Sequence, residues 1–585
     1  MVQQLSWKVG GQQGEGIEST GEIFSTALNR LGYYLYGYRH FSSRIKGGHT
    51  NNKIRVSTTQ VRSVSDDLDI LVAFDQETID VNVHELRVGG VVIADAKFNP
   101  SLPETCTTAT LYAVPFTEIA TELGTSLMKN MVAVGASSAV LHIDTEVFEE
   151  VVLEIFGKKG QKVVQKNMEA IKKGADYIRE QLGEQLETMK LDPADGKKRM
   201  FMIGNDAIAL GALAGGARFM PAYPITPASE IMEYLIKKLP QFGGTVIQTE
   251  DEIAACTMAI GANYAGVRAL TASAGPGLSL MMESIGLAGI TEQPVVIIDT
   301  QRGGPSTGLP TKQEQSDLMA MIYGTHGEIP KIVMAPSTVE EAFYDTIEAF
   351  NLAEEYQCPV IMLTDLQLSL GKQSVEPLDY SRVEIRRGKL QQGELEEREE
   401  KQYYKRYRVT EDGVSPRVIP GMKHGIHHVT GVEHDETGKP SESPVNRDDQ
   451  MNKRLRKTKG IRFNTPIHVH SHEKESDILF VGFNSTRGVI EEAMERLEQD
   501  GIKVNHAHIR LIHPFPADEL LPYVQGAKKV VVVENNATGQ LANILKMNIA
   551  SHDKIQSVLK YDGNPFLPQE VYAKSKEMFV LNGNV

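Results

Sequence analysis

The chain has 585 residues, of which 41% are hydrophobic and 23% are charged, an ordinary composition for a globular protein. A chain of this length is expected to form several domains rather than a single core. Its formal net charge of −15 disfavours binding to nucleic acid or to an anionic membrane, because both require clustered Lys and Arg.

The three cysteines, Cys106, Cys256 and Cys358, are far apart in the sequence. They form no CxxC pair, so the chain itself carries neither a cysteine zinc site nor an iron–sulfur cluster, and no disulfide framework is expected. The first residues lack the basic start and apolar core of a signal peptide, and no apolar run is long enough to span a membrane. These features predict a soluble protein of the reducing cytoplasm.

Residues 1–190 alternate between strand and helix patterns. An apolar strand at 5–9 leads into GGQQGEG (10–16), and an amphipathic helix pattern with Ile23, Ala27 and Leu31 follows. Further strands are predicted at 69–75 and 91–96. This alternation predicts a mostly parallel sheet, and the charged, helical stretch at 158–198 is interpreted as a linker.

Residues 199–375 alternate more clearly and predict a doubly wound parallel sheet. One helix is expected to start at Pro227, because the fixed φ of proline suits the first turn of a helix. The predicted strands are 200–204, 245–250, 267–274, 294–300 and 359–365.

Residues 376–474 contain charge runs and turns with weak periodicity, which indicates an irregular connecting segment over a surface. Residues 475–585 return to α/β alternation. Strands are predicted there at 475–483, 503–513 and 528–536, with a helix at 489–501.

The loop at 10–16 has glycines at positions 10, 11, 14 and 16, which is not the G-x-G-x-x-G spacing. Two interpretations stay open. The loop is either a tight turn that needs glycine for steric reasons, or an anion site in which N–H groups at a helix start bind a phosphate, such as one of coenzyme A. The anion site would comprise Gly11, Gln12, Gly14, Gly16, Arg44 and Lys46.

The segment YPITP (223–227) places two prolines around Thr226 at the end of a strand. The prolines fix the backbone, and the next helix offers N–H groups beside the Thr226 hydroxyl. Together they suit a carboxylate.

Three consecutive acids, Glu250, Asp251 and Glu252, precede a helix with small residues that include Ala259 and Gly261. Taken alone, they are better explained as acids that cap the positive end of an amphipathic helix. Two strand-to-loop segments follow, TASAGPG (271–277) and QRGGPSTG (301–308). Ligands of open α/β sheets bind at this carboxyl edge, where Arg302 suits a carboxylate through paired hydrogen bonds.

These four motifs, in this order, resemble the α subunit of the 2-oxoacid:ferredoxin oxidoreductases, most closely the 2-oxoglutarate type with an N-terminally fused γ domain. GGQQGEG and SRIKGG resemble that γ domain, although its usual loop lacks the extra Gln. HIRLIHPFP and VVVENNATGQL resemble the family's transketolase-C-like domain. The resemblance implies three α/β domains, with the following divisions: a γ-like domain (1–190), a thiamine-diphosphate aminopyrimidine-binding domain (199–375), the irregular connecting segment (376–474) and a transketolase-C-like domain (475–585).

The implied reaction is oxidative decarboxylation of a 2-oxoacid with coenzyme A (CoA) to acyl-CoA, CO₂ and reduced ferredoxin. 2-Oxoglutarate is the preferred substrate, and pyruvate, branched-chain 2-oxoacids or indolepyruvate are the alternatives. The chain lacks the GDG-plus-Asn motif for Mg²⁺ and the diphosphate, as well as a cysteine cluster. Mg²⁺ and the [4Fe–4S] cluster are therefore expected on a β subunit, in a (γα–β)₂ heterotetramer that shares thiamine diphosphate and reduces ferredoxin.

An interpretation of another class is a non-catalytic assembly or nucleotide-sensing subunit. Under the enzyme interpretation, the resemblance identifies Glu252 as the catalytic carboxylate that hydrogen-bonds N1′ of the aminopyrimidine. It also implies that Thr226 and Arg302 bind the substrate's 1-carboxylate and count as catalytic. The remaining implied contacts are Tyr223, Pro224, Ile225, Gly275 and Gly277 for the cofactor, and Pro227, Ser306 and Thr307 for the substrate.

Two histidine-rich segments raise the question of a metal site. In the second segment the histidines alternate, which places them on one face of an extended strand, and no helical i, i+4 pair accompanies a catalytic glutamate. We therefore predict no metal site on this chain. The histidines are His424, His427, His428 and His434, and then His468, His470 and His472.

Overall fold

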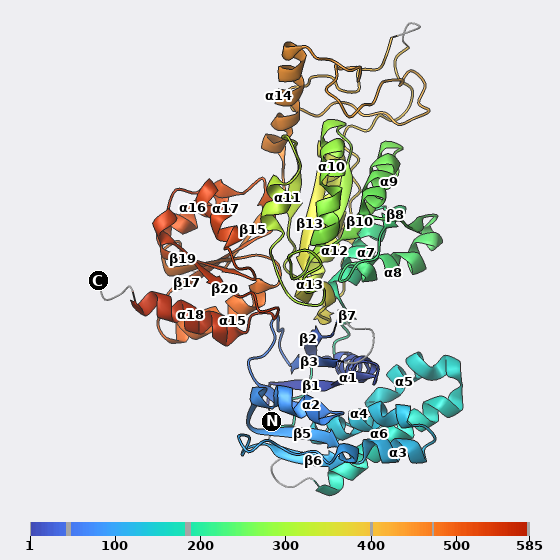
Figure 1. The fold of residues 1–585 in the computed structure, drawn as a ribbon, viewed down its shortest axis with the longest axis vertical. Coiled ribbons are helices and arrows are strands. Elements are labelled where there is room, and N and C mark those ends of the chain that lie inside the picture. Colours follow the sequence, from blue (N-terminus) through green and yellow to red (C-terminus); the bar gives the residue numbers. More distant parts are fainter. Residues whose placement is uncertain (1, 43–47, 182–188, 398–401, 471–472, 582–585) are drawn as a thin grey trace. The chain divides into compact units, whose positions relative to one another are not determined.

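The computed structural model describes residues 2–42, 48–181, 189–397, 402–470 and 473–581. The chain divides into two compact units (Figure 1). The first contains Met1–Met202 with two returning segments, Leu370–Pro377 and Phe566–Glu570, and the second contains the rest. Both units are α/β structures: the sheets of the second are largely parallel, whereas the sheet of the first is mixed rather than mostly parallel as expected.

The first unit is built on one sheet with the strand order β6-β5-β4-β1-β3-β2-β14-β7. The pairs β6-β5, β5-β4 and β4-β1 are parallel. The pairs β1-β3, β3-β2, β2-β14 and β14-β7 are antiparallel. The strands are β1 (Gln4–Gln12), β2 (Tyr34–His40), β3 (His49–Ser57), β4 (Leu68–Ala73), β5 (Leu86–Asp95), β6 (Thr110–Val114), β7 (Met200–Met202) and β14 (Gln373–Val375). The helices are α1 (Ile17–Arg30), α2 (Gln76–Asn82), α3 (Phe116–Glu122), α4 (Lys129–Val140), α5 (Glu149–Phe156) and α6 (Gln161–Gln181).

The interpretation of residues 158–198 as a linker is wrong for α6, which belongs to the core of the first unit. The apolar stripe of α6 joins the cluster of Trp7, Phe24 and Phe116. The helix also lies so close to α4 that a Cβ on Gly174 would stand 2.1 Å from the carbonyl oxygen of Val132. The outer face of α6 is highly charged, and this hid the apolar stripe in the sequence.

The strand predicted at 200–204 is β7, and it lies in the first unit rather than in the central sheet. It pairs antiparallel with β14, with Met202 opposite Gln373. The preceding residue, Arg199, fixes this course because its guanidinium binds the Gly32 carbonyl oxygen at 2.8 Å and Glu376 at 2.7 Å.

The second unit contains a central sheet with the order β10-β11-β13-β12-β18, and a β8-β9 pair is joined to it by a bridge between Phe219 and Ala269. Only β18 runs antiparallel to its neighbour. The strands are β8 (Phe219–Ala222), β9 (Thr245–Gln248), β10 (Leu270–Ser273), β11 (Val295–Gln301), β12 (Ile332–Met334), β13 (Pro359–Asp365) and β18 (Leu511–His513). The helices of this region are α7 (Gly204–Ala214), α8 (Ser229–Lys238), α9 (Glu252–Tyr264), α10 (Gly275–Ile290), α11 (Leu318–Tyr323), α12 (Val339–Tyr356), α13 (Leu366–Leu370) and α14 (Pro444–Gly460).

The central strands are apolar runs because both faces of the sheet are covered by helices. Ile297 and Leu363 share a core cluster with Leu278 of α10 and Leu318 of α11, and α12 lies against β11 and β13. This layering leaves only the strand ends and their loops free to carry polar chemistry.

A third sheet follows in the order β15-β17-β16-β19-β20, parallel except for β15 (Figure 1). The strand predicted at 503–513 is two strands: β17 stays in this sheet, and β18 crosses to the central sheet. The elements are β15 (Ile467–His470), β16 (Ser476–Gly482), β17 (Val504–Ile509), β19 (Ala527–Glu534), β20 (Ile555–Leu559), α15 (Thr486–Gln499), α16 (Ala517–Gly526), α17 (Gln540–Asn548) and α18 (Pro568–Leu581).

The connecting segment is irregular over most of its described length, but α14 was not expected from the sequence. Its buried residues are polar: Lys453 and Lys457 are 0% exposed and pair with the equally buried Glu292 at 2.6 and 2.5 Å. A helix that buries charges shows no apolar periodicity, so pattern analysis cannot detect it.

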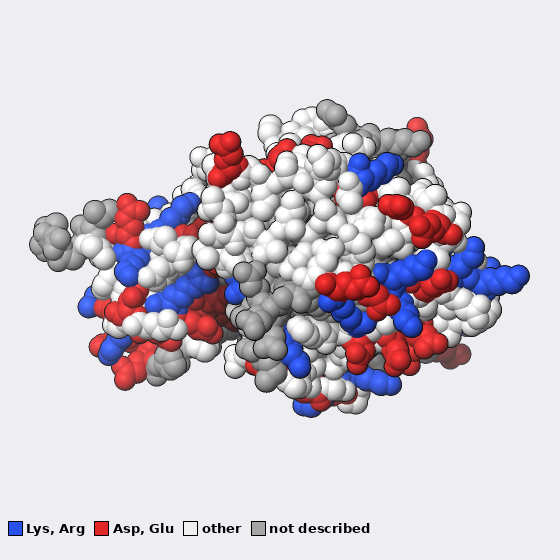
Figure 2. Space-filling model, turned by 90° about the horizontal axis from the view of Figure 1, so that it is seen from below, with Lys and Arg blue, Asp and Glu red and all other residues white. Residues whose placement is uncertain are grey.

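In the part of the chain that the structure describes, no helix is both long and apolar enough to cross a membrane. Figure 2 shows one face of the molecule, on which acidic and basic side chains are interspersed. No continuous basic track of the kind that a phosphate backbone requires is visible among the described residues of that face.

Candidate functional site

The predicted motifs meet at the carboxyl edge of the central sheet. β10 ends at Ser273 and β11 at Gln301, and their loops lead into α10 and into the QRGGPSTG segment. β8 ends at Ala222, just before the YPITP segment. This is the edge at which open parallel sheets bind ligands.

The three acids before α9 have three different environments. Glu250 is exposed. Asp251 is the N-cap of the helix and accepts a 2.8 Å hydrogen bond from the backbone N–H of Ala254. Glu252 is the first helical residue and is only 6% exposed. Only Glu252 therefore combines a buried carboxylate with no role as a helix cap.

The start of α10 lies directly against Glu252. A Cβ on Gly277 would be 2.7 Å from Oε1 of Glu252 and 2.0 Å from Oγ of Ser273. Two residues earlier, a Cβ on Gly275 would be 2.8 Å from both carboxylate oxygens of Asp317. Both glycines are thus required for the close approach of α10 to acidic side chains.

Arg302 lies one residue beyond β11 and is 7% exposed. Its Nη1 donates to the backbone carbonyl of Thr226 at 2.6 Å, and its Nη2 donates to that of Thr307 at 3.2 Å. The buried Nε has no hydrogen-bond partner among the described residues. Arg302 therefore joins the YPITP and QRGGPSTG segments and keeps unused donors.

The YPITP segment forms a turn, and Pro227 does not open a helix as expected. α8 begins at Ser229, with Ala228 at its N-cap. The Pro227 carbonyl accepts a 2.7 Å hydrogen bond from Nδ2 of the buried Asn205 on α7, which holds the turn apart from the helix. Tyr223, the first residue of the segment, is 39% exposed.

The QRGGPSTG loop closes on itself. The Leu309 N–H donates to the Gly303 carbonyl at 2.8 Å, and a Cβ on Gly308 would meet the same carbonyl at 2.1 Å. Ser306 and Thr307 are exposed at the tip. Thr307 joins Arg302 through its backbone only, and no hydrogen bond of the Ser306 side chain is found in the described structure.

The sequence analysis did not single out two carboxyl groups near this edge, Asp299 on β11 and Asp317 at the N-cap position of α11. Asp299 is completely buried, and burial together with the charge of Asp317 raises the pKa of its carboxyl. The signal was present as one acid inside the apolar run PVVIIDT (294–300), since buried charges are rare and usually paired.

The N-terminal loop is shorter than predicted. Gly11 and Gln12 belong to β1 and pair with β3, and a Cβ on Gly11 would be 2.8 Å from Cδ1 of Ile17. The turn itself contains Gly14 and Gly16, with φ of 98° and 83°, values that favour glycine. Arg44 and Lys46 lie outside the described residues. Steric needs therefore explain these glycines, whether or not the turn also binds an anion.

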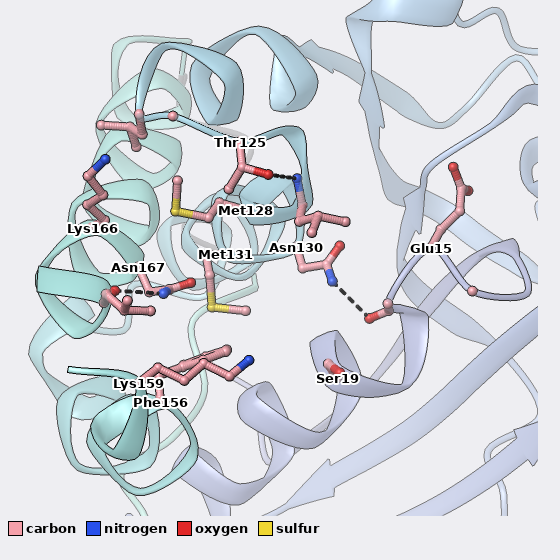
Figure 3. Close-up of a pocket in the computed structure, with 16 residues that line it drawn as sticks. Glu15, Ser19, Thr125, Met128, Asn130, Met131, Phe156, Lys159, Lys166 and Asn167 are labelled. Atoms are coloured by element: carbon pink, nitrogen blue, oxygen red, sulfur yellow. Dashed lines mark hydrogen bonds between the residues drawn. The ribbon is translucent and has the colours of Figure 1, made fainter.

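A cavity of about 370 Å³ opens beside this turn, between α1, α4 and α6 (Figure 3). Met128, Met131 and Phe156 provide apolar walls, and Lys159 and Lys166 lie on its rim. Within the described structure neither lysine forms a salt bridge.

Asn130 is the polar group at the centre of this cavity. It donates from Nδ2 to the Gly16 carbonyl at 3.2 Å, and its buried Oδ1 has no partner among the described residues. The cavity therefore offers positive charge, apolar walls and one unused acceptor to a ligand.

The histidines do not gather around a metal site, since no cluster of three or more His, Cys, Asp or Glu suited to a metal exists in the described residues. His468 instead pairs with Glu341 at 2.5 Å, and His427 and His434 bind backbone carbonyls. His472 lies outside the described residues.

Three family models match the chain. Residues 6–177 match "Pyruvate ferredoxin/flavodoxin oxidoreductase", residues 210–453 match "Pyruvate flavodoxin/ferredoxin oxidoreductase, thiamine diP-bdg", and residues 476–571 match "Pyruvate:ferredoxin oxidoreductase core domain II". The second match covers Thr226, Glu252 and Arg302.

The relatives match over almost their full length. The 2-oxoacid:ferredoxin oxidoreductase subunit alpha of a Sulfolobus species is 35% identical, covering 100% of this chain and 99% of its own. The 2-oxoglutarate oxidoreductase subunit KorA of Mycobacterium tuberculosis is 32% identical, covering 96% and 89%. The 2-oxoglutarate:ferredoxin oxidoreductase structure from Magnetococcus marinus is 36% identical with a TM-score of 0.92, covering 99% of this chain and 100% of its own. These matches confirm the family inferred from the motifs: the chain belongs to the α subunits of the 2-oxoacid:ferredoxin oxidoreductases.

Proposed function

We propose that this chain supplies the aminopyrimidine half of a thiamine diphosphate site, with Glu252 hydrogen-bonding N1′ of the cofactor. The observation that carries the proposal is the environment of Glu252, a buried carboxylate at a helix start that caps nothing and lies against the start of α10 at Gly277. When bound, thiamine diphosphate supplies the nucleophilic carbon and the electron sink for decarboxylation. Glu252 holds the proton at N1′, while Tyr223, Pro224, Ile225 and Gly275 shape the surrounding wall.

Arg302 binds the 1-carboxylate of the 2-oxoacid together with Thr226. A guanidinium has five N–H donors, and among the described residues Arg302 uses two of them, on the carbonyls of Thr226 and Thr307. The remaining donors, including the buried Nε, suit a carboxylate. Pro227, Ser306 and Thr307 complete this side of the site.

The substrate is a 2-oxoacid, and 2-oxoglutarate is our first choice because the Magnetococcus marinus structure is described with 2-oxoglutarate, coenzyme A and succinyl-CoA bound. Pyruvate, branched-chain 2-oxoacids and indolepyruvate remain the alternatives. Comparing kcat/KM for these acids in the assembled complex decides between them.

Coenzyme A acts as the co-substrate, and its anionic part binds at the cavity of the first unit beside Gly14 and Gly16. The support is the combination of the start of α1 and the lysines Lys159 and Lys166 that line the cavity. Lys166→Gln should raise KM for coenzyme A and leave KM for the 2-oxoacid unchanged.

A β subunit carrying the Mg²⁺ motif and the [4Fe–4S] cluster covers α9 and α10 in a (γα–β)₂ heterotetramer, and ferredoxin accepts the electrons. These two helices pack side by side and are apolar all round, a feature of buried helices. Yet Ile253, Met258 and Leu280 are 38% to 51% exposed in this chain. The dispersed cysteines fit a reducing cytoplasm.

The test is turnover of 2-oxoglutarate, CoA and ferredoxin by the assembled complex, compared with that of Glu252→Gln. Full activity in the variant would favour the non-catalytic interpretation of this chain.

A further inference from the structure

The connecting segment buries an arginine side chain that has no matching carboxylate. Arg406 is 0% exposed, and its Nη2 donates to the backbone carbonyl of Glu292 at 2.7 Å. Its Nε and Nη1 are buried and have no hydrogen-bond partner among the described residues. The N–H groups of both nitrogens therefore lack an acceptor, which is rare for a buried charged group and calls for an explanation.

The side chains that meet at Glu292 carry more positive than negative charge. Lys453 and Lys457 of α14 pair with the Glu292 carboxylate at 2.6 and 2.5 Å, and Arg406 binds the backbone of the same residue. All four side chains are 0% exposed. Three completely buried cations thus gather around a single buried carboxylate.

Two nearby acids are engaged with other arginines. Glu354 pairs with Arg417 at 2.9 Å, and Glu433 pairs with Arg454 at 2.6 Å. Arg406 forms no ion pair with either acid in the part of the chain that the structure describes. Its positive charge is therefore not matched by a carboxylate of those residues.

Loss of a proton cannot remove this charge. A buried lysine can become neutral, and burial lowers the pKa of Lys453 to about 8, although the charge of Glu292 opposes this shift. A guanidinium, by contrast, does not lose its proton in a protein. A water molecule would accept hydrogen bonds from Arg406, but it would not offset the buried charge.

Tyr407 provides a second polar group beside Arg406. The Arg406 guanidinium lies over its ring, with Cζ 5.1 Å from the ring centroid, and the ring offsets part of the positive charge. The Tyr407 hydroxyl is also buried and has no hydrogen-bond partner within the described structure. Two adjacent buried side chains therefore carry donors that no acceptor among those residues satisfies.

We infer that Arg406 binds a small monovalent anion, of which chloride is the example we choose, through Nε and Nη1. Such an ion supplies both an acceptor for these N–H groups and the negative charge that the surrounding cations lack. Because Arg406, Glu292 and both lysines are completely buried, the site suits a single-atom ion better than a phosphate or an organic acid. The ion stabilises the packing of three elements, the irregular part of the connecting segment, α14 and the end of α10, and this role is independent of catalysis.

The first test replaces chloride by bromide, which can be located by its anomalous scattering in crystals of the assembled complex. We expect an anomalous peak within hydrogen-bonding distance of Nε or Nη1 of Arg406. The absence of a peak there would overturn the inference, because water would then satisfy these donors.

The second test measures thermal melting of the full-length chain at constant ionic strength while gluconate is replaced by chloride. A ligand that binds only the folded state stabilises it, so Tm should rise by about 2–4 °C and then level off. Arg406→Met should abolish this rise. The matched control is Arg386→Met, because Arg386 lies in the same segment and its guanidinium already binds Glu355 and Glu348 at 2.8 Å each. This control should retain the rise.

Each outcome of the melting test decides for or against the anion. A rise that survives in Arg406→Met, or that is lost equally in Arg386→Met, would show a general salt effect and would overturn the inference. A wild-type Tm that is the same in chloride and gluconate would also overturn it. If Arg406→Met does not fold, the bromide peak in the wild-type complex decides alone.

Discussion

Arg302 donates a 2.6 Å hydrogen bond from Nη1 to the backbone carbonyl of Thr226, 76 positions earlier in the chain. This bond joins the QRGGPSTG and YPITP segments directly. The sequence predicted only that both segments lie at the same edge of the sheet. Thr226 contributes its carbonyl to this contact, so its hydroxyl, and not its backbone, remains for a ligand. The same guanidinium also donates to the Thr307 carbonyl, so Arg302 has a structural role besides the binding role that we propose for it.

Replacing Arg302 by Ala should lower kcat/KM for the 2-oxoacid by about 2–4 kcal/mol, the loss expected for a charged, paired contact. Affinity for thiamine diphosphate should change little. Arg302→Lys should restore activity only in part, because an ammonium cannot reproduce the planar fork. Steady-state kinetics of the assembled complex measure both. An unchanged kcat/KM in Arg302→Ala would place the carboxylate site elsewhere.

The purified single chain should be colourless and should not turn over a 2-oxoacid. Its three cysteines are dispersed, two of them buried, and the sequence lacks the motif for Mg²⁺ and the diphosphate. An absorbance spectrum and a viologen-reduction assay test this directly. Robust dye reduction by the chain alone would show that the site does not need a partner.

The cap of α9 can be separated from the chemistry next to it. Asp251→Ala removes the 2.8 Å bond to the Ala254 N–H and should lower the free energy of unfolding by about 1 kcal/mol. Glu250 is exposed, so Glu250→Ala should change it by less than about 0.5 kcal/mol. Denaturant titrations measure the difference, and equal effects of the two changes would contradict the assignment of Asp251 as the cap.

The buried cluster around Glu292 should make stability sensitive to acid. Its interactions with Lys453, Lys457 and Arg406 outweigh burial and hold the pKa of Glu292 well below its usual range. The contribution of Glu292 is therefore fully present above its unfolded value of 4.5 and is lost as the pH falls below it. Burial lowers the pKa of Lys453 to about 8, although the charge of Glu292 opposes this shift.

Removing one member of this cluster should be costly because it leaves buried lysines without a counter-charge. Glu292→Gln should reduce the free energy of unfolding by about 3–5 kcal/mol at pH 7, and the difference from wild type should shrink towards pH 3. Thermal melts across this pH range test the prediction. A difference that does not depend on pH would mean that Glu292 acts through packing rather than charge.

The sequence predicted the helices and strands whose buried side chains are apolar. The strands of the central sheet are continuous apolar runs, and the structure has them close to their predicted positions, for example β11 and β13. It could not predict α14, whose buried residues include Lys453 and Lys457, since a charged buried face has no hydrophobic period. The interpretation of α6 as a linker was wrong because the charged outer face of this helix masks the apolar face that packs into the core.

Some features of the candidate site could likewise be predicted from the sequence, and others could not. Motif spacing placed Glu252 and Arg302 near one edge, because the carboxyl ends of parallel strands must share it. It could not indicate which of the three consecutive acids is buried, since that depends on where α9 begins and on the close approach of α10 at Gly277. The approach of the Asp317 carboxylate to Gly275 at the start of α10 likewise depends on packing between distant segments, which no local pattern encodes.

The decisive prediction concerns Glu252. Its proposed role requires a hydrogen bond that strengthens as N1′ gains proton character, so it acts in the transition state for removal of the C2 proton. Glu252→Gln keeps the size of the side chain but cannot supply the acidic proton. Removal of the C2 proton should slow by about 10²–10⁴-fold, the usual span for a positioned acid–base group, while cofactor binding survives through the diphosphate on the partner.

Hydrogen–deuterium exchange at thiazolium C2 in the assembled complex measures this step without turnover. Glu250→Gln is the matched control, because Glu250 is exposed whereas Glu252 is 6% exposed, and the two substitutions remove the same charge at the same helix end. If acids merely favour a helix N-terminus, both variants should exchange like wild type. Slow exchange in Glu252→Gln alone supports the catalytic assignment. Exchange at the wild-type rate in Glu252→Gln, or slow exchange in Glu250→Gln instead, would move the catalytic carboxylate to another residue.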